Sequence, residues 1–479
     1  MAGMRSQAMH FQARAGQKLA DEVLQGALRR AQPLFTAKRQ KGMVSLAADG
    51  LDFGHLRAAA AAIRQAVLDD LDVWLELFEA RAKARGAEVL WARDGAEVSQ
   101  LVVDLARRHA VRTVTKSKSM LSEEAALNAA LLAAGVRPVE TDLGEYIVQL
   151  ADEPPSHIIA PAVHKTIAQV DALFADAHGR PRQTRHSSDI PALAREAREI
   201  LRPQFLAADM GISGANFLVA ETGSAVLVTN EGNGRLVTTL PRLHVVITGI
   251  EKVVPTLEDV ATLLRLLPRS ATGQDISNYV SLLTGTKSAD ESDGPDQTVF
   301  ILVDNGRAGL LGSEFEPMLR CIRCGACMNH CPVYFSLGGH AYGWVYPGPM
   351  GSVLTPLLTG LDQALDLPWA STGCNQCGEV CPVDIPLPAL MRGLRERQQH
   401  QQLRPRGERW ARRVWGWLAL RPRLYRWLTR GLVRYLHWLA DGQGRIRIFG
   451  LVPGWTAGRD LPVGPGRSFH ELYAARKRD

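Results

Sequence analysis

Apolar positions recur at helical spacing through the first part of the chain. The run LRRAQPLFTAKRQKGM, residues 28–43, is basic and amphipathic, and residues 56–86 are rich in Ala with apolar residues at intervals of three and four. This pattern predicts a helical lead-in over residues 1–85.

From Glu88 onward the pattern changes to short apolar runs that alternate with helical stretches. The runs EVLWA, VRTVT, RPVET and HIIAP read as strands, with a helix to His109 and another over residues 122–134. Such a βαβ alternation predicts a parallel sheet covered by helices. We therefore expect an α/β domain over residues 86–312.

A second block, residues 216–256, alternates apolar strands with Gly and Asn turns and precedes a helix at about 257–267. Its strands are expected to join the same sheet. The polar run at 285–297 predicts a loop before the strand TVFILVD.

Polar residues in this block could instead form a site. The candidates for binding an anion or a carboxylate are Glu221, Asn230, Glu231, Asn233 and Arg235. A tight hairpin at residues 230–235 is favoured, because Asn-Gly and Gly-Asn steps suit strand connections.

All seven cysteines lie between Cys321 and Cys381. The first four form the run C-I-R-C-G-A-C-M-N-H-C-P, the spacing of bacterial ferredoxins, in which the fourth cysteine ligates the other cluster of a two-cluster unit. An odd number of crowded cysteines favours metal ligation in a reducing compartment over disulfides. Structural zinc is the less favoured alternative.

The second run, C-N-Q-C-G-E-V-C-P, has Ser371 where a first cysteine would stand. Exchange of the fourth cysteine predicts two ligand groups. The first cluster has four ligands and the second three: Cys321, Cys324, Cys327 and Cys381 for cluster one; Cys331, Cys374 and Cys377 for cluster two. Two [4Fe–4S] clusters are expected, the second completed by a non-cysteine ligand or reduced to [3Fe–4S].

Three further groups of residues have both a functional and a structural interpretation. The connector between the cysteine runs could bring His340, Tyr342 and Tyr346 to a cluster or ligand, but a tight packing loop is favoured. A metal pair could be formed by His157 and His164, but structural roles are favoured for both. An anion could bind at Lys116 and Lys118, but a plain helix start is favoured for the segment that holds Ser122, Glu123 and Glu124.

Charge is concentrated at the end of the chain. The net charge is +7, but residues 404–479 contribute +12 and the remainder −5. Residues 399–479 are expected to form a basic helical tail with Trp410, Trp417 and Trp427 on apolar faces. This pattern suits an anionic membrane surface or a partner subunit, and only the charge suggests nucleic acid, so no nucleic-acid partner is expected.

The opening residues lack the apolar core of a secretory signal, and no stretch reaches about 20 apolar residues. We therefore expect a cytoplasmic protein, with contact to the inner membrane face through the tail.

Five phrases spread along the chain resemble the lactate-utilisation protein B family. They are the cysteine region 321–382 together with TKSKSMLSEE (115–124), the segments 140–166 and 211–236, and GGHAYGWVYPGPMGSVLTPLL (338–358). The resemblance implies a LUD domain of the NagB/RpiA/CoA-transferase type, a ferredoxin-type domain over 313–398 and a C-terminal family region. It also implies seven cysteines, so Ser371 is no departure.

The same resemblance implies an electron-transfer subunit of a system that oxidises L-lactate to pyruvate. Its partners would be a cysteine-rich protein of the heterodisulfide-reductase type and a second LUD protein. No flavin or nicotinamide fingerprint is evident, so whether this chain is itself an enzyme stays open. The alternatives are a CoA-transferase-like enzyme with structural clusters and an iron–sulfur sensor, the latter disfavoured because no DNA-binding module is evident.

Overall fold

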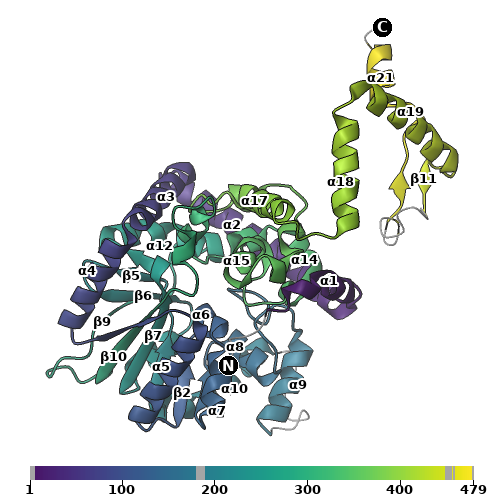
Figure 1. Cartoon of the computed structure of the whole chain (residues 1–479). Helices are drawn as coiled ribbons and strands as arrows, with labels where there is room; N and C mark the ends of the chain where they lie inside the picture. The colour runs from purple at the N-terminus through teal and green to yellow at the C-terminus, as the bar shows by residue number, and fades with distance from the viewer. Residues whose placement is uncertain (1–5, 180–188, 448–455, 457–458, 477–479) are drawn as a thin grey trace. The chain divides into compact units, whose positions relative to one another are not determined.

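A parallel sheet forms the centre of the larger of two compact units. The computed structural model describes residues 6–179, 189–447, 456 and 459–476. The units are Met1–Gln398 and Gln399–Asp479. The six strands, all parallel, lie in the order β1-β10-β7-β4-β2-β3 (Figure 1) and span Glu88–Ala92 (β1), Thr113–Lys116 (β2), Arg137–Glu140 (β3), Met210–Ser213 (β4), Leu243–Gly249 (β7) and Gln297–Val303 (β10).

Helices cover both faces of this sheet, as the βαβ pattern predicted. On one face Val245 and Ile301 pack against α5 (Gly95–Arg108) and α7 (Leu127–Ala133). On the other face Phe300 meets Phe78 of α4 (Leu71–Ala84), with ring centroids 5.2 Å apart. Strands buried on both faces read as continuous apolar runs, which is why TVFILVD and LHVVITG are so apolar.

A second sheet holds the other strands, so the expectation that residues 216–256 extend one sheet was only partly right. Of this block, only β7 joins the parallel sheet. The others form a smaller, mainly antiparallel sheet in the order β8-β5-β6-β9: Val253–Val254 (β8), Phe217–Val219 (β5), Ser224–Thr229 (β6) and Tyr279–Thr284 (β9).

Three local predictions were wrong. Residues 230–235 do not form a hairpin, because α11 (Asn233–Thr239) begins there and packs against β4. The close packing of α11 against β4 depends on Gly211 of β4, because a Cβ there would lie 1.9 Å from the Val237 carbonyl oxygen. The helix over 122–134 is broken into α6 (Met120–Glu124) and α7 by Ala126, which has a φ of 51°.

The third wrong prediction is the strand at HIIAP. His157 accepts hydrogen bonds at Nδ1 from the backbone N–H groups of Ile159 (3.0 Å) and Ala160 (3.1 Å). These bonds turn the backbone around the imidazole, so the segment is a loop.

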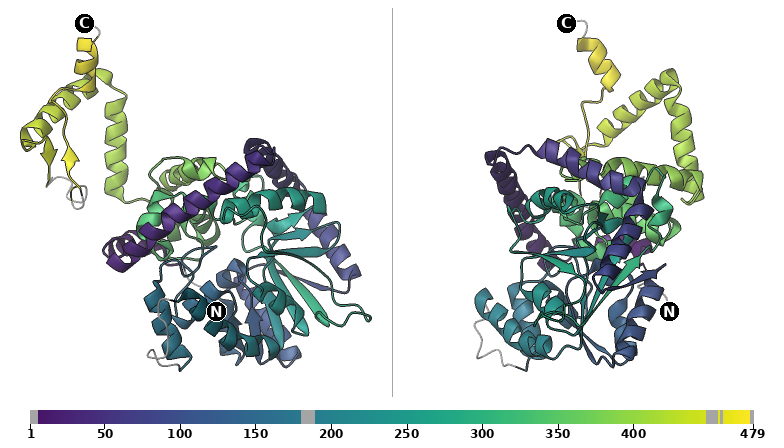
Figure 2. Two further views of the ribbon diagram at one scale, coloured as in Figure 1. Left: turned by 180° about the vertical axis from the view of Figure 1, so that it is seen from behind. Right: turned by 90° about the vertical axis from the view of Figure 1, so that its left-hand side faces the viewer.

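The described part of residues 1–85 is mainly helical, as predicted, and its helices contact the cysteine-bearing segment as well as the sheet domain. Helix α2 (Glu22–Ala48) runs across the cysteine-bearing segment (Figure 2) and contacts both α12 and α14. Asp21 and Asp52 cap α2 and α3 by accepting hydrogen bonds from Leu24 and His55. The remaining helices of the unit are α1 (Phe11–Leu19), α3 (Phe53–Asp69), α8 (Leu143–Leu150), α9 (Ile167–Ala177), α10 (Ile190–Leu206), α12 (Leu257–Ala271), α13 (Ala326–Asn329), α14 (Pro332–Leu337), α15 (Gly348–Thr359), α16 (Gln376–Glu379) and α17 (Leu387–His400).

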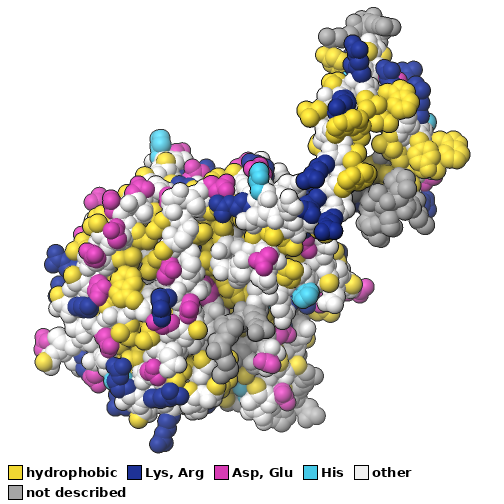
Figure 3. Space-filling view, in the orientation of Figure 1, with side chains coloured by type: hydrophobic (Ala, Val, Ile, Leu, Met, Phe, Trp, Pro, Cys, Tyr) yellow, Lys and Arg dark blue, Asp and Glu magenta, His cyan; other side chains and the backbone are white. Residues whose placement is uncertain are grey.

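The second unit carries the predicted basic helices. Aromatic and basic side chains lie together on the surface of α18 and α19 (Figure 3), and neither helix has a fully buried residue. Among the described residues, no helix is long and apolar enough to cross a membrane. The elements are α18 (Arg406–Ala419), α19 (Pro422–Leu439), α21 (Phe469–Arg476) and the strand pair β11 (Arg445–Ile446) and β12 (Leu461–Pro462).

Candidate functional site

The two cysteine runs fold as a repeat. In each run a left-handed residue follows the second ligand position, Gly325 (φ 74°) after Cys324 and Asn375 (φ 63°) after Cys374. A one-turn helix then carries the third cysteine, and the run ends in Cys-Pro. The local conformations therefore align Cys374 with Cys324, the register that the spacing predicted.

Four cysteines from both runs line one small cavity. Its walls include the four residues of the predicted first group together with apolar side chains: Cys321, Cys324, Cys327 and Cys381; Ile158, Met318, Ile322, Met350 and Ile385. Cys381 reaches it from the second run. The geometry thus brings together the residues that exchange of the fourth cysteine requires.

The other three cysteines lie near one another. Burial, together with the charges of Cys331 and Cys374, raises the pKa of the Cys377 thiol to about 12. Cys377 also contributes to the raised pKa of Cys327, which belongs to the first group. The two groups are therefore neighbours, as electron transfer between two centres requires.

Ser371 stands where the second group lacks a thiol. Its hydroxyl accepts a hydrogen bond from the backbone N–H of Gly373 (3.1 Å), which shapes the turn before Cys374. The Tyr342 hydroxyl is buried and has no hydrogen-bond partner among the described residues, and burial, with the charges of Cys331 and Cys327, raises its pKa.

The environment of these thiols suits ligands of an iron–sulfur cluster better than free, unligated thiols. Burial raises the pKa of Cys381 to about 11 and those of Cys324 and Cys327 above the usual range. Buried thiols of this kind are inert until a metal displaces their protons. Backbone N–H groups point at the sulfurs of Cys321 (from Arg323, 3.4 Å) and Cys381 (from Ile385, 3.4 Å), donors that stabilise bound thiolate.

Basic side chains surround the first group. Six basic side chains each interact electrostatically with at least one of its cysteines: Arg39, Arg57, Arg64, Lys252, Arg320 and Arg323. Arg57 donates to the Cys381 carbonyl (2.9 Å), and Lys252 donates to that of Cys321 (3.1 Å). Sequence reasoning missed these residues, because three of the six come from the lead-in helices and no local pattern marks any of them as a neighbour of the cysteines.

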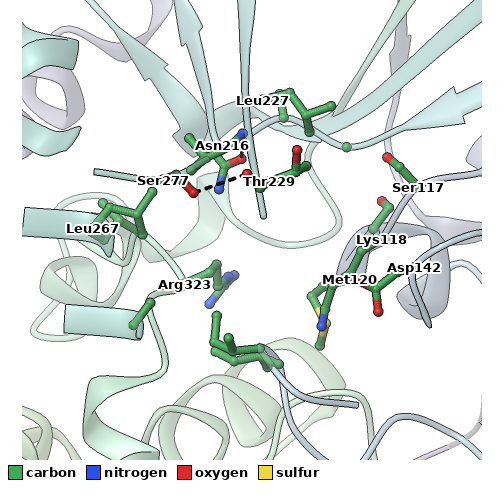
Figure 4. Close-up of a pocket in the computed structure, with 18 of the residues that line it drawn as sticks. Ser117, Lys118, Met120, Asp142, Asn216, Leu227, Thr229, Leu267, Ser277 and Arg323 are labelled. Carbon is green, nitrogen blue, oxygen red and sulfur yellow. Dashed lines mark hydrogen bonds between the residues drawn. The ribbon is translucent and has the colours of Figure 1, made fainter. Parts of the chain in front are cut away.

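A separate cavity of about 510 Å³ lies at the carboxyl ends of β2, β4 and β7 (Figure 4). Its lining includes Lys118, Asn216, Thr248 and Arg323. Arg323 and Ile322 also line the cavity of the first cysteine group, so the two cavities share a wall.

The polar residues that the sequence offered as site candidates fall into two groups, those that line the large cavity and those that do not. Lys118, Asn230, Glu231 and Asn233 line the large cavity. The others do not and have structural partners: Lys116 binds Glu140 (2.6 Å), Glu221 accepts from the Leu257 N–H (2.7 Å), His157 binds Asn329 (2.8 Å), and His164 binds Glu153 (2.7 Å). The helix start predicted at Ser122 is wrong by two residues, because α6 begins at Met120 and Ser119 is its cap.

Of the connector residues, the tyrosines are buried as a packing loop requires. Tyr346 donates to Glu124 and lies under the guanidinium of Arg323, 4.6 Å from ring centroid to Cζ. His340 bonds at Nε2 to the Pro154 carbonyl (2.8 Å). Tyr346 also lines the large cavity, which the favoured interpretation did not anticipate.

Family models match three segments of the chain. The LUD domain matches residues 75–303, the 4Fe-4S dicluster domain residues 317–385, and the C-terminal region of lactate utilisation protein B residues 392–478. With the two cysteine groups, these matches identify an iron–sulfur protein.

Several curated relatives match over almost the full length. "Lactate utilization protein B" of Lysinibacillus sphaericus is 40% identical, covering 99% of this chain and 98% of that protein. The protein of the same name in Bacillus subtilis is 39% identical, with 98% and 96% coverage. The "uncharacterized electron transport protein YkgF" of Escherichia coli is 39% identical, with 97% and 96% coverage. A crystal structure of a DUF162 family protein from Deinococcus radiodurans covers 49% of this chain and 98% of its own at 15% identity, with a TM-score of 0.28.

Proposed function

This chain belongs to the lactate utilisation protein B family, and we propose from that premise that it is an electron-transfer subunit of a system oxidising L-lactate to pyruvate. The observation that carries the proposal is the pair of adjoining cysteine groups, since iron–sulfur clusters pass single electrons between neighbouring centres. In this role the clusters carry electrons from lactate oxidation onward.

The proposed ligands follow the two groups. Cluster one takes Cys321, Cys324, Cys327 and Cys381, and the shared cavity of these four supports the assignment. Cluster two takes Cys331, Cys374 and Cys377, and support comes from the contribution of Cys374 to the raised pKa of Cys331 and of both to that of Cys377. With three thiolates, cluster two is either a [4Fe–4S] cluster with a fourth, non-cysteine ligand or a [3Fe–4S] cluster.

The experiment that tests this proposal compares two cysteine variants with the parent protein, all purified anaerobically. Cys381→Ala is expected to abolish the EPR signal of cluster one, and Cys377→Ala that of cluster two, although both residues belong to the second run. Iron analysis of the parent should give about seven or eight atoms per chain.

Loss of the same EPR signal in both variants would overturn the ligand assignment. Stoichiometric zinc in place of iron would overturn the electron-transfer proposal altogether.

The competing proposal, a CoA-transferase-like LUD enzyme with structural clusters, gains little from the site. Its carboxylate candidate, Glu221, is occupied by the Leu257 N–H and does not line the large cavity. Lactate oxidation that persists after both clusters are destroyed would nevertheless favour the enzyme proposal.

Membership of the family implies a lactate-utilisation system with other subunits. We propose that the partners are a cysteine-rich protein of the heterodisulfide-reductase type and a second LUD protein. A two-electron acceptor is needed for lactate, and the partners would provide it, since clusters accept electrons singly.

The C-terminal helices support a further location for this activity, at the cytoplasmic face of the inner membrane. Trp410 and Trp417 on α18 and Trp427 on α19 are more than half exposed and stand among arginines. Exposed Trp with Arg is the composition of helices that lie in an anionic lipid interface.

A further inference from the structure

The large cavity lies where parallel sheets place their ligands. The chain passes from β2 outward to β3 and then returns across β2 to β4, so the strand order reverses between β2 and β4. At such a switch point the loops after the two strands separate and leave a crevice at their carboxyl ends. Ser117 and Lys118 follow β2, and Gly214 to Asn216 follow β4, and all of them line the cavity.

The cavity has the size and walls of a site for an organic molecule. Its volume of about 510 Å³ lies within the range of typical ligand pockets. Apolar side chains line much of it: Phe35, Met120, Ile158, Ile159, Leu227 and Leu267. A three-carbon acid alone would leave most of this space unfilled, so the walls suit a ligand with a larger apolar body.

The charges in the lining favour an anion. Five basic residues line the cavity against three acidic ones. Arg323 lies 3.6 Å from Glu251, but that carboxylate is shared with Arg307, which is nearer at 2.9 Å. Lys118 and Arg323 enter the cavity from opposite sides (Figure 4).

Lys118 lacks a full counter-charge. Its ammonium has no hydrogen-bond partner among the described residues, and its nearest carboxylate is Glu145 at 3.9 Å. Burial and the charge of Glu140 raise the pKa of Glu145 well above its usual value, so Glu145 offers little negative charge. Two of the three acids that line the cavity accept hydrogen bonds from backbone N–H groups at the start of α8: Asp142 from Glu145, and Glu231 from Leu143.

Two buried hydroxyl groups of the lining are also unpartnered. Ser117 and Thr248 are each 2% exposed, and neither side-chain oxygen has a hydrogen-bond partner among the described residues. Buried hydroxyls in folded proteins are nearly always hydrogen-bonded. Their presence in one cavity points to a ligand that completes their bonds.

We propose that this cavity binds an organic anion with an apolar body, its acidic group held between Lys118 and Arg323. Arg323 lies in the first cysteine run, and its backbone N–H donates to the sulfur of Cys321. A ligand at its guanidinium is therefore next to cluster one. The site stands on the cavity alone, whereas its effect on cluster one rests on the function proposed above.

The test is calorimetric titration of the full-length, anaerobically purified protein with four anions. Phenylpyruvate and flavin mononucleotide combine an aromatic body with a carboxylate or a phosphate, lactate is a small carboxylate, and inorganic phosphate has no body. At least one of the first two should bind at one site per chain, and at least tenfold more tightly than lactate and phosphate. Which of the two binds identifies the acidic group.

Two substitutions should weaken that binding. Lys118→Met and Arg323→Gln each remove one of the facing cations, and each should raise the dissociation constant about tenfold or more. Thr248→Val, which is nearly isosteric, should weaken binding less. The control is Lys83→Met, since Lys83 is exposed on α4 and pairs with Glu79 outside the cavity.

Iron content and circular dichroism show whether each variant is folded and loaded. The bound anion should also shift the EPR signal of cluster one in the parent protein and leave that of cluster two unchanged. The proposal is overturned if neither large anion binds, if lactate binds as tightly, or if both cavity substitutions leave affinity unchanged. Absence of iron with binding intact would instead overturn only the electron-transfer proposal.

Discussion

Arg39 shows how one side chain distant in sequence affects the first cysteine group. It extends from α2, donates to the Val380 carbonyl (3.3 Å), lies over the ring of Phe53, and interacts with Cys324 and Cys381. A positive charge near a cluster favours the added electron and so raises the reduction potential.

Replacing Arg39 with Gln should therefore lower the potential of cluster one. If the lost interaction is on the order of 1 kcal/mol, the shift is about 40 mV for one electron. Arg39→Lys keeps the charge and is the matched control. EPR-monitored redox titration measures both, and equal potentials in the two variants would show that the charge of Arg39 does not act on the cluster.

At this scale the sequence predicts ligands better than their surroundings. The cysteines are recognisable because ligand spacing within a run is a local property, and the register of Cys374 follows from it. Arg39, Arg57 and Arg64 reach the site only through the packing of α2 and α3, which no local pattern reveals. The sequence named four residues of the cavity as candidates, Lys118, Asn230, Glu231 and Asn233, but favoured structural roles for them, and the other walls come from distant segments.

Among the elements, the strongly periodic ones were predictable and the short polar ones were not. Strands EVLWA and TVFILVD and the helix after Thr256 were predicted correctly. The hairpin at 230–235 failed because turn chemistry there serves the start of α11, and only the glycine in the distant strand β4 makes room for that helix.

The two C-terminal helices lead to a prediction about lipid. The full-length protein should bind vesicles that contain phosphatidylglycerol, bind neutral phosphatidylcholine vesicles several-fold more weakly, and lose the difference at high salt. Replacing Trp410, Trp417 and Trp427 by Ala should abolish binding, measured by co-sedimentation.

Trp91→Ala is the matched control, because Trp91 is an exposed tryptophan outside the tail that bonds to Glu79. Vesicle binding unaffected by the triple substitution would exclude the lipid interface, and binding of the tail to a partner subunit would then explain the exposed aromatic residues.

In the larger unit, the large cavity, the first cysteine group and the second cysteine group lie next to one another in that order. The large cavity shares Ile322 and Arg323 with the cavity of the first cysteine group, and Cys327 of that group interacts electrostatically with Cys377 of the second group. The proposed order therefore runs from an organic ligand to cluster one and then to cluster two, or the reverse. The lead-in helices hold this arrangement together, since Arg57 of α3 bonds to the Cys381 and Gly378 carbonyls.

Freeze-quench EPR of the clusters after mixing with L-lactate tests the electron-transfer role directly. The isolated chain without added flavin should show no reduction, because its sequence carries no recognised flavin or nicotinamide fingerprint and clusters accept electrons singly. With the two partner subunits present, both cluster signals should appear, and Cys321→Ala should remove that of cluster one. Lactate oxidation by the isolated chain that persists after both clusters are destroyed would contradict the electron-transfer account.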